Sequence, residues 1–82
     1  MLPGMIRGAT RIVGKSQGYL GLPIRDVIIN DTVNGPDTPA METVWEPTPA
    51  EMAALAAGAP VKVTILGQVP PPMMVSVGEV PR

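Results

Sequence analysis

Glycine and proline constrain the fold of this chain more than any other feature of its sequence. Nine glycines and eleven prolines occur in 82 residues, about twice the share of an ordinary globular protein. Such a content can indicate disorder, but most of these residues stand between segments of clean apolar alternation, where turns and helix caps belong. They therefore predict a single small domain over residues 1–82, with two clusters left over at 14–21 and 70–72.

The alternating segments predict a small α+β fold, built on a mainly antiparallel sheet of about five strands. The Asn34-Gly35-Pro36-Asp37 sequence favours a turn that joins the second and third strands into a hairpin. The last two strands form a second hairpin, and the expected order is β-β-β-α-β-β. The expected strands cover residues 5–13, 26–33, 41–46, 61–66 and 73–77.

One short helix is expected between the third and fourth strands. Thr48-Pro49-Ala50-Glu51 has the hydroxyl, the proline and the glutamate of a capping box. Ala50–Ala57 consists of strong helix formers, and Gly58 suits the left-handed position after the last turn. Because so short a helix does not persist alone in water, we expect it to pack on the sheet through Met52, Leu55, Ala56 and Ala59.

The residue types that are missing exclude most catalytic chemistry. The chain has no Cys, no His and no Phe, and only one Trp and one Tyr. Without Cys and His there is no disulfide framework and no zinc site of the usual kind. Neither a Cys–His nor a Ser–His–Asp nucleophile can be assembled. We therefore expect a protein that is not an enzyme, with no catalytic residue, no metal site and no cofactor.

Charge is segregated along the chain, although the net charge is only −1. Residues 1–25 carry four basic side chains and no acidic one, whereas residues 26–51 carry six acidic side chains and no basic one. Two interpretations are open: basic and acidic strands pair across a sheet, or the basic segment faces an anionic ligand. A duplex nucleic acid is not an expected partner, because binding to phosphates needs a cationic excess.

The glycine-rich segment 14–21 is the candidate ligand site. Gly14-Lys15-Ser16 resembles the end of a phosphate-binding loop, but the first glycine of that motif is absent and no helix is expected to follow. Backbone N–H groups of such a loop can still form a nest for an anion, and a tyrosine can stack on a ring. The alternative is a simple connection with the tyrosine in the core. The candidate contacts to a small anionic or nucleotide ligand are Arg11, Lys15, Ser16, Tyr19 and Arg25.

Trp45 and the proline run Pro70, Pro71 and Pro72 form a candidate interface. Tryptophan concentrates binding energy where proteins meet, and three successive prolines favour a stiff polyproline II segment. The alternative for Trp45 is packing at the start of the helix. Because so small a core without disulfide or metal is marginal, we expect a homo-oligomer.

Membrane and export features are not expected in this chain. No apolar run approaches the roughly 18–20 residues that a bilayer span requires. The first residues lack the charged cap and apolar stretch of a signal peptide. We therefore expect no membrane association and a cytoplasmic protein.

Three local motifs carry a resemblance to a group of proteins. Gly14–Asp26 (GKSQGYLGLPIRD), Trp45–Glu51 (WEPTPAE) and Val61–Gly67 resemble short proteins encoded by phages and prophages of proteobacteria, which have His-Pro-Pro where this chain has its proline run. The resemblance implies a non-catalytic protein that counters host defence, by sequestering an anionic or nucleotide ligand or by blocking a host protein. The alternative is a virion protein for decoration, cement or connection. The first would act in the cytoplasm of the host cell, and the second in the virion.

Overall fold

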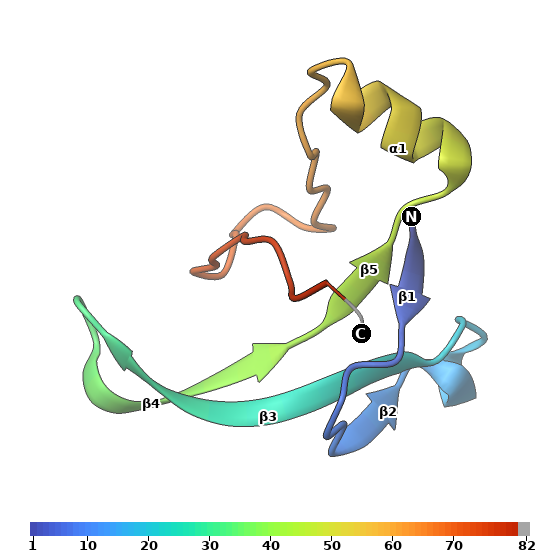
Figure 1. Ribbon diagram of the computed structural model, residues 1–82. Helices are drawn as coiled ribbons and strands as arrows, with labels where there is room; N and C mark the ends of the chain where they lie inside the picture. Colours follow the sequence, from blue (N-terminus) through green and yellow to red (C-terminus); the bar gives the residue numbers. More distant parts are fainter. Residues whose placement is uncertain (81–82) are drawn as a thin grey trace.

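The computed structural model describes residues 1–80, which form five antiparallel strands in two sheets and one short helix (Figure 1). In the three-stranded sheet, β3 (Leu22–Asp31) lies between β2 (Arg11–Val13) and β4 (Gly35–Glu42). The two-stranded sheet pairs β1 (Leu2–Gly4) with β5 (Val44–Glu46). The expected class, a small antiparallel α+β fold with one short helix, is confirmed.

The hairpin of β3 and β4 forms as the alternation and the Asn-Gly sequence indicated. The turn lies slightly earlier than expected, because Gly35 already begins β4 and pairs with Asp31. The Asp31 carboxylate accepts hydrogen bonds from the backbone N–H groups of Val33 (3.2 Å) and Asn34 (2.8 Å). Gly35 has a φ of 91°, and the register shifts between Ile29 and Asp31. The left-handed glycine beside a register shift fits a bulge that closes the turn.

The prediction of one continuous strand over residues 5–13 is wrong. Residues 5–13 contain a turn in which the Ala9 N–H donates to the Ile6 carbonyl (3.2 Å) and Gly8 has a φ of 76°. This glycine allows the chain to reverse, so that β1 ends before the turn and β2 begins after it. The third expected strand, 41–46, is also divided. Its first part ends β4, and its second part is β5, which leaves the first sheet to pair with β1.

Helix α1 (Pro49–Ala56) begins at the predicted capping box. The Thr48 hydroxyl accepts from the Glu51 N–H (3.2 Å), and the Glu51 carboxylate accepts from the Thr48 N–H (2.8 Å). The Met1 amine also donates to the Glu51 carboxylate (2.7 Å). The hydrogen bond from this amine, followed by that from the Thr48 N–H, lowers the pKa of Glu51 from 4.5 to about 2. Gly58 follows the last turn with a φ of 101°. The helix has no buried residue, and Met52 is exposed rather than packed on the sheet.

The prediction of two strands after the helix is wrong, and the strands and the helix follow one another in the order β-β-β-β-β-α. Residues 61–66 and 73–77 have no regular secondary structure, and all of residues 60–80 are exposed. No backbone hydrogen bond within the described residues involves 60–80. Alternation gives these segments a strand-like face, but a strand also needs an edge to pair with. The outer edge of β4 is a poor partner because Pro36 and Pro39 have no N–H to donate.

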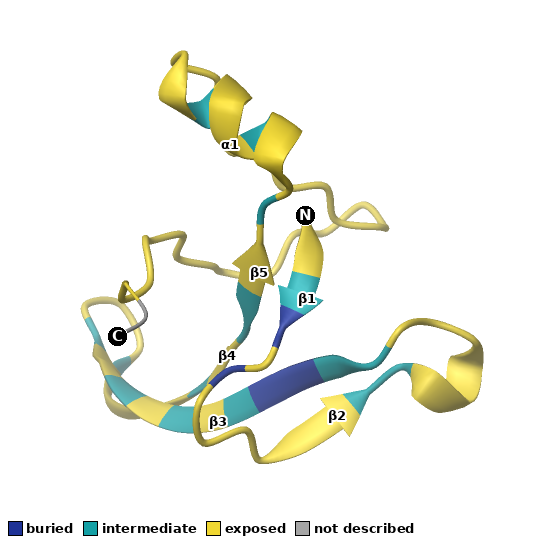
Figure 2. Cartoon of the chain, turned by 45° about the vertical axis from the view of Figure 1, so that its right-hand side comes forward, coloured by how far each residue is buried: buried dark blue, intermediate teal, exposed yellow. Residues whose placement is uncertain are grey.

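The core is very small. Ile6 and Ile24, each 6% exposed, are the buried large apolar residues of residues 1–80, and they lie where the corner between β1 and β2 meets β3 (Figure 2). The accessible surface is 7332 Å². A compact chain of this mass would expose roughly 4,600 Å². Most apolar side chains of this fold therefore remain in contact with solvent.

Replacing Gly35 by alanine should destabilise the hairpin by about 1 kcal/mol, because a left-handed φ is unfavourable for any residue with a Cβ. An added Cβ would meet nothing within 4 Å, so the whole cost lies in the backbone. Amide exchange of β3 and β4 measures the effect. Gly78, which also has open space and lacks a positive φ, is the matched control and should tolerate alanine. Equal exchange in the two variants would contradict the role given to Gly35.

Candidate functional site

The glycine-rich segment folds into a tight turn. The short 3-10 helix η1 (Lys15–Gln17) lies between Gly14 and Gly18, whose φ angles are 94° and 85°. The N–H groups of Gln17 and Tyr19 donate to the Gly14 carbonyl at 3.2 and 3.1 Å, and that of Gly18 donates to the Lys15 carbonyl at 3.2 Å. These three donors are satisfied inside the turn. They are therefore not available to an anion, as a nest would require.

The side chains of this turn are exposed. Tyr19 is 68% exposed, so the alternative that places it in the core is not what the structure has. The aliphatic stem of Lys15 lies over Gly21, where an added Cβ would come within 3.0 Å of the Lys15 Cε. Neither Lys15 nor Ser16 has a side-chain hydrogen bond or ion pair to another described residue. Lys15 is thus the cation that this turn presents to solvent.

The two candidate arginines are paired with acids across the three-stranded sheet. Arg11 on β2 forms an ion pair with Asp26 on β3 (3.0 Å), and Arg25 on β3 forms one with Glu42 on β4 (2.7 Å). Of the two interpretations of the charge pattern, pairing of basic with acidic strands is therefore confirmed. Because Arg25 and Asp26 are consecutive on one strand, the two ion pairs lie on opposite faces of the sheet. The structure does not bring the two arginines to one point.

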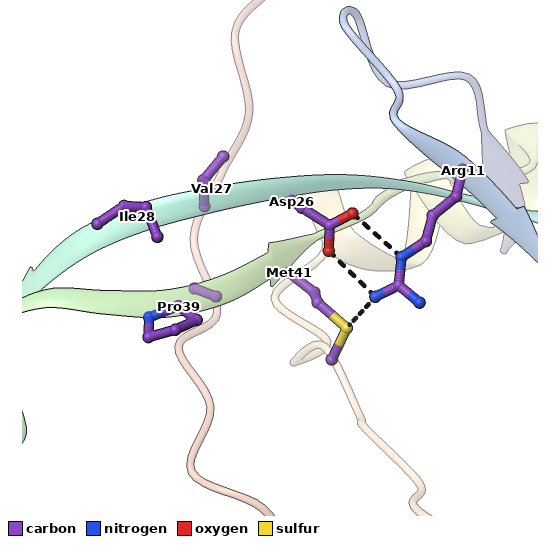
Figure 3. Close-up of a pocket in the computed structure, with 7 residues that line it drawn as sticks. Arg11, Asp26, Val27, Ile28, Pro39 and Met41 are labelled. Atoms are coloured by element: carbon purple, nitrogen blue, oxygen red, sulfur yellow. Dashed lines mark hydrogen bonds and ion pairs between the residues drawn. The ribbon is translucent and has the colours of Figure 1, made fainter.

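Arg11 lies at the end of a shallow hollow of about 510 Å³ on the sheet (Figure 3). Its guanidinium holds Asp26 with two hydrogen bonds, of 3.1 and 3.0 Å, and also contacts the Met41 sulfur at 3.0 Å. The Thr10 hydroxyl donates to the same carboxylate at 2.6 Å. The bonds from Arg11, followed by that from Thr10, hold the pKa of Asp26 below its ordinary value. The charge in this hollow is thus already neutralised.

A second hollow, of about 430 Å³, collects both aromatic side chains of the protein. We call it the aromatic hollow. Pairing of β1 with β5 sets Pro3 opposite Trp45, and pairing of β2 with β3 sets Val13 opposite Leu22. The turn that follows η1 adds Tyr19. The full lining is Pro3, Val13, Gly14, Tyr19, Leu20, Leu22 and Trp45.

The aromatic hollow joins two features that the sequence predicted separately. Tyr19 was a candidate ligand contact and Trp45 a candidate interface residue, and both now line one apolar surface. Trp45 is 49% exposed, and its indole N–H donates to the Thr43 hydroxyl at 3.1 Å. Sequence reasoning missed the aliphatic members of the lining, since their convergence depends on the pairing of strands far apart in the chain. The other candidate interface residues, Pro70, Pro71 and Pro72, are exposed and line neither hollow.

Residues 1–80 contain neither a cluster of metal ligands nor a membrane-spanning helix. That part of the chain has no group of three or more acidic, His or Cys side chains placed to hold a metal ion. Its helix is too short to cross a bilayer, and no other helix of sufficient length and apolarity is present among the described residues. No protein-family model, no curated protein and no solved structure matches the chain.

Arg11→Gln should raise the pKa of Asp26 toward its ordinary value of 3.8, because the strongest hydrogen bonds to the carboxylate are removed. A carboxyl group whose pKa is lowered by folding stabilises the fold at pH values above its ordinary pKa. This stabilisation is lost as the pH falls through the lower pKa of the folded state. The variant should therefore lose less stability on acidification than the unchanged chain. NMR titration of the Asp26 carboxyl measures the shift. Arg25→Gln, on the other face of the sheet, is the control and should leave the pKa of Asp26 lowered. An unchanged pKa of Asp26 in Arg11→Gln would contradict the role given to Arg11.

Proposed function

We propose that this chain is a non-catalytic binding protein of phage type, which counters host defence by blocking a host protein through the aromatic hollow. The observation that carries the proposal is the convergence of Tyr19 and Trp45, which are 68% and 49% exposed, on one apolar surface. Large aromatic side chains at the centre of a depression provide most of the energy of many protein interfaces. Strand pairing holds Trp45 in place before any partner binds, which lowers the entropy lost on association.

The electrostatics favour a protein partner over a small anion. Arg11 and Arg25 are neutralised by acidic neighbours on opposite faces, and three N–H groups of the turn are satisfied internally. Lys15 is left as the single cation of the η1 turn. One lysine and one exposed ring make a weak site for a nucleotide phosphate, which is usually held by several converging donors. An apolar depression with two aromatic residues is better suited to side chains of another protein.

The phage context rests on the sequence resemblance. The motifs around Lys15 and Trp45 that resemble short phage and prophage proteins include the turn and the strand that form the aromatic hollow. A small protein without catalytic chemistry acts by occupying a surface. Blocking a component of host defence is such an action, and it would take place in the cytoplasm of the infected cell.

Expression of the chain in a bacterium with an active phage-defence system should raise the plating efficiency of a phage that the system restricts. Leu20→Glu should abolish the effect, because it places a charge at the exposed rim of the aromatic hollow. Met52→Ala is the matched control on α1, which is exposed and lies outside the hollow. Comparison of circular dichroism spectra checks that both variants fold. Equal protection by all three proteins, or by none in a panel of defence systems, would contradict the proposal.

Nucleotide sequestration is tested in the same preparation. If the chain blocks a protein, its thermal midpoint should not move when linear and cyclic nucleotides are added. A ligand at 100 times its Kd would add about 2.7 kcal/mol of stability and shift the midpoint visibly. A shift that disappears in Lys15→Ala would reassign the site to an anionic ligand held by the η1 turn.

A structural role in the virion is the second candidate, favoured by the large exposed surface. The 7332 Å² of accessible area is far above what a compact chain of this size exposes. Exposed apolar surface of this extent is characteristic of subunits that pack against neighbours. Co-purification with phage particles through a density gradient would support this role. Absence from particles during an infection in which the chain is produced would exclude it.

A further inference from the structure

The aromatic hollow has the lining of sites that bind polyproline II segments. Such sites are grooves of aromatic side chains that receive successive prolines, and they exploit a ligand that loses little conformational freedom on binding. Here Tyr19 and Trp45 supply the rings, and Pro3 and Leu22 supply the apolar floor. The Tyr19 hydroxyl makes no hydrogen bond to another residue of 1–80, so it can donate to a backbone carbonyl of a ligand.

The same chain carries a segment with the matching properties. Val69 and the three prolines that follow it are exposed, with Val69 at 88%, and no backbone hydrogen bond within the described residues involves them. Three consecutive prolines have no N–H to donate and favour the polyproline II conformation. Their carbonyl groups are free acceptors. Such a segment can be recognised only by apolar contact and by donors such as a tyrosine hydroxyl.

The two complementary surfaces lie apart in one molecule. The chain around residue 70, at the left of Figure 1, is on the opposite side of the structure from η1, at the right. The exposed area also exceeds the compact expectation by roughly 2,700 Å², well above the roughly 800 Å² that each partner buries in a standard interface. Docking of the segment itself covers only a small part of this area, whichever copy supplies it. When two copies associate, the surfaces that meet around this contact can cover much more.

We propose that the aromatic hollow of one copy binds the Val69–Pro72 segment of a second copy in polyproline II conformation. The inference rests on the assignment of the hollow as the binding site, and it names a second copy of the chain as an occupant. Each copy contributes one hollow and one segment, so the contact can be made in either of two ways. Two copies that exchange segments reciprocally close a dimer, and a non-reciprocal arrangement forms a ring or an open chain. Self-association and binding of a host protein then compete for one surface.

The test uses the full chain and two variants with complementary defects. One variant, Tyr19→Ala, has a weakened hollow and an intact proline segment. The other carries Pro70→Ala, Pro71→Ala and Pro72→Ala together, and keeps the hollow. Because these residues lie outside the strands and the α-helix, both variants should retain the fold, which circular dichroism checks. Sedimentation velocity over a range of concentrations gives the oligomeric state.

The unchanged chain should oligomerise as its concentration rises, and each variant alone should remain monomeric. An equimolar mixture of the two variants should form a one-to-one complex, because one partner supplies the segment and the other the hollow. The single tryptophan, Trp45, reports the same event, since its emission should shift to shorter wavelength when the segment covers it. Met52→Ala, outside both surfaces, should oligomerise as the unchanged chain does.

Three outcomes would overturn the inference. They are a monomeric unchanged chain at all concentrations, a triple variant that oligomerises normally, and a mixture that forms no complex. The plating assay separates this failure from that of the proposed function. A triple variant that still protects the phage while Leu20→Glu does not would leave the hollow as the functional site and remove only the second copy as its occupant.

Discussion

Pairing of β3 with its two neighbours is the interaction on which the rest of the structure depends. This strand holds β2 and β4 by backbone hydrogen bonds, and it carries one member of each ion pair across the sheet. With Ile6 and Ile24 as the buried large apolar side chains of the described residues, little else in the interior fixes the strands. A sheet of three strands is near the lower limit of independent stability. The fold is therefore maintained by main-chain pairing more than by core packing.

Local features of this fold were predictable from the sequence, because their causes are local. The capping box needs only Thr48 and Glu51 at the right spacing, and the β3–β4 hairpin needs only a turn between alternating segments. The division of the first strand at Gly8 was missed, because a glycine in a β-branched stretch is compatible with either a strand or a turn. Pairing of β1 with β5 joins the beginning of the chain to its middle, and no local pattern specifies such a partner.

Segments 61–66 and 73–77 illustrate a different limit. Their alternation is as clean as that of β3, yet they form no strand in the described structure. Alternation reports which face of a strand would be apolar, whereas strand formation also requires an edge with free donors and acceptors. The candidate site shows the same limit. Arg11 and Arg25 lie on neighbouring strands of one sheet, but register and strand parity place them on opposite faces. Only the assembled sheets bring Tyr19 to Trp45.

The prolines of β4 also reduce the tendency of the protein to aggregate. An exposed six-residue stretch such as 61–66, rich in β-branched residues and free of proline, is the kind of segment that seeds cross-β fibrils. The fold offers this stretch a poor template, because Pro36 and Pro39 on β4 have no N–H to donate and Asp37 adopts a φ of 59° there. Lys62 adds a charge within the stretch, in the manner of a gatekeeper residue. The chain thus keeps the apolar residues of 60–80 exposed to solvent while hindering their growth into an ordered fibril.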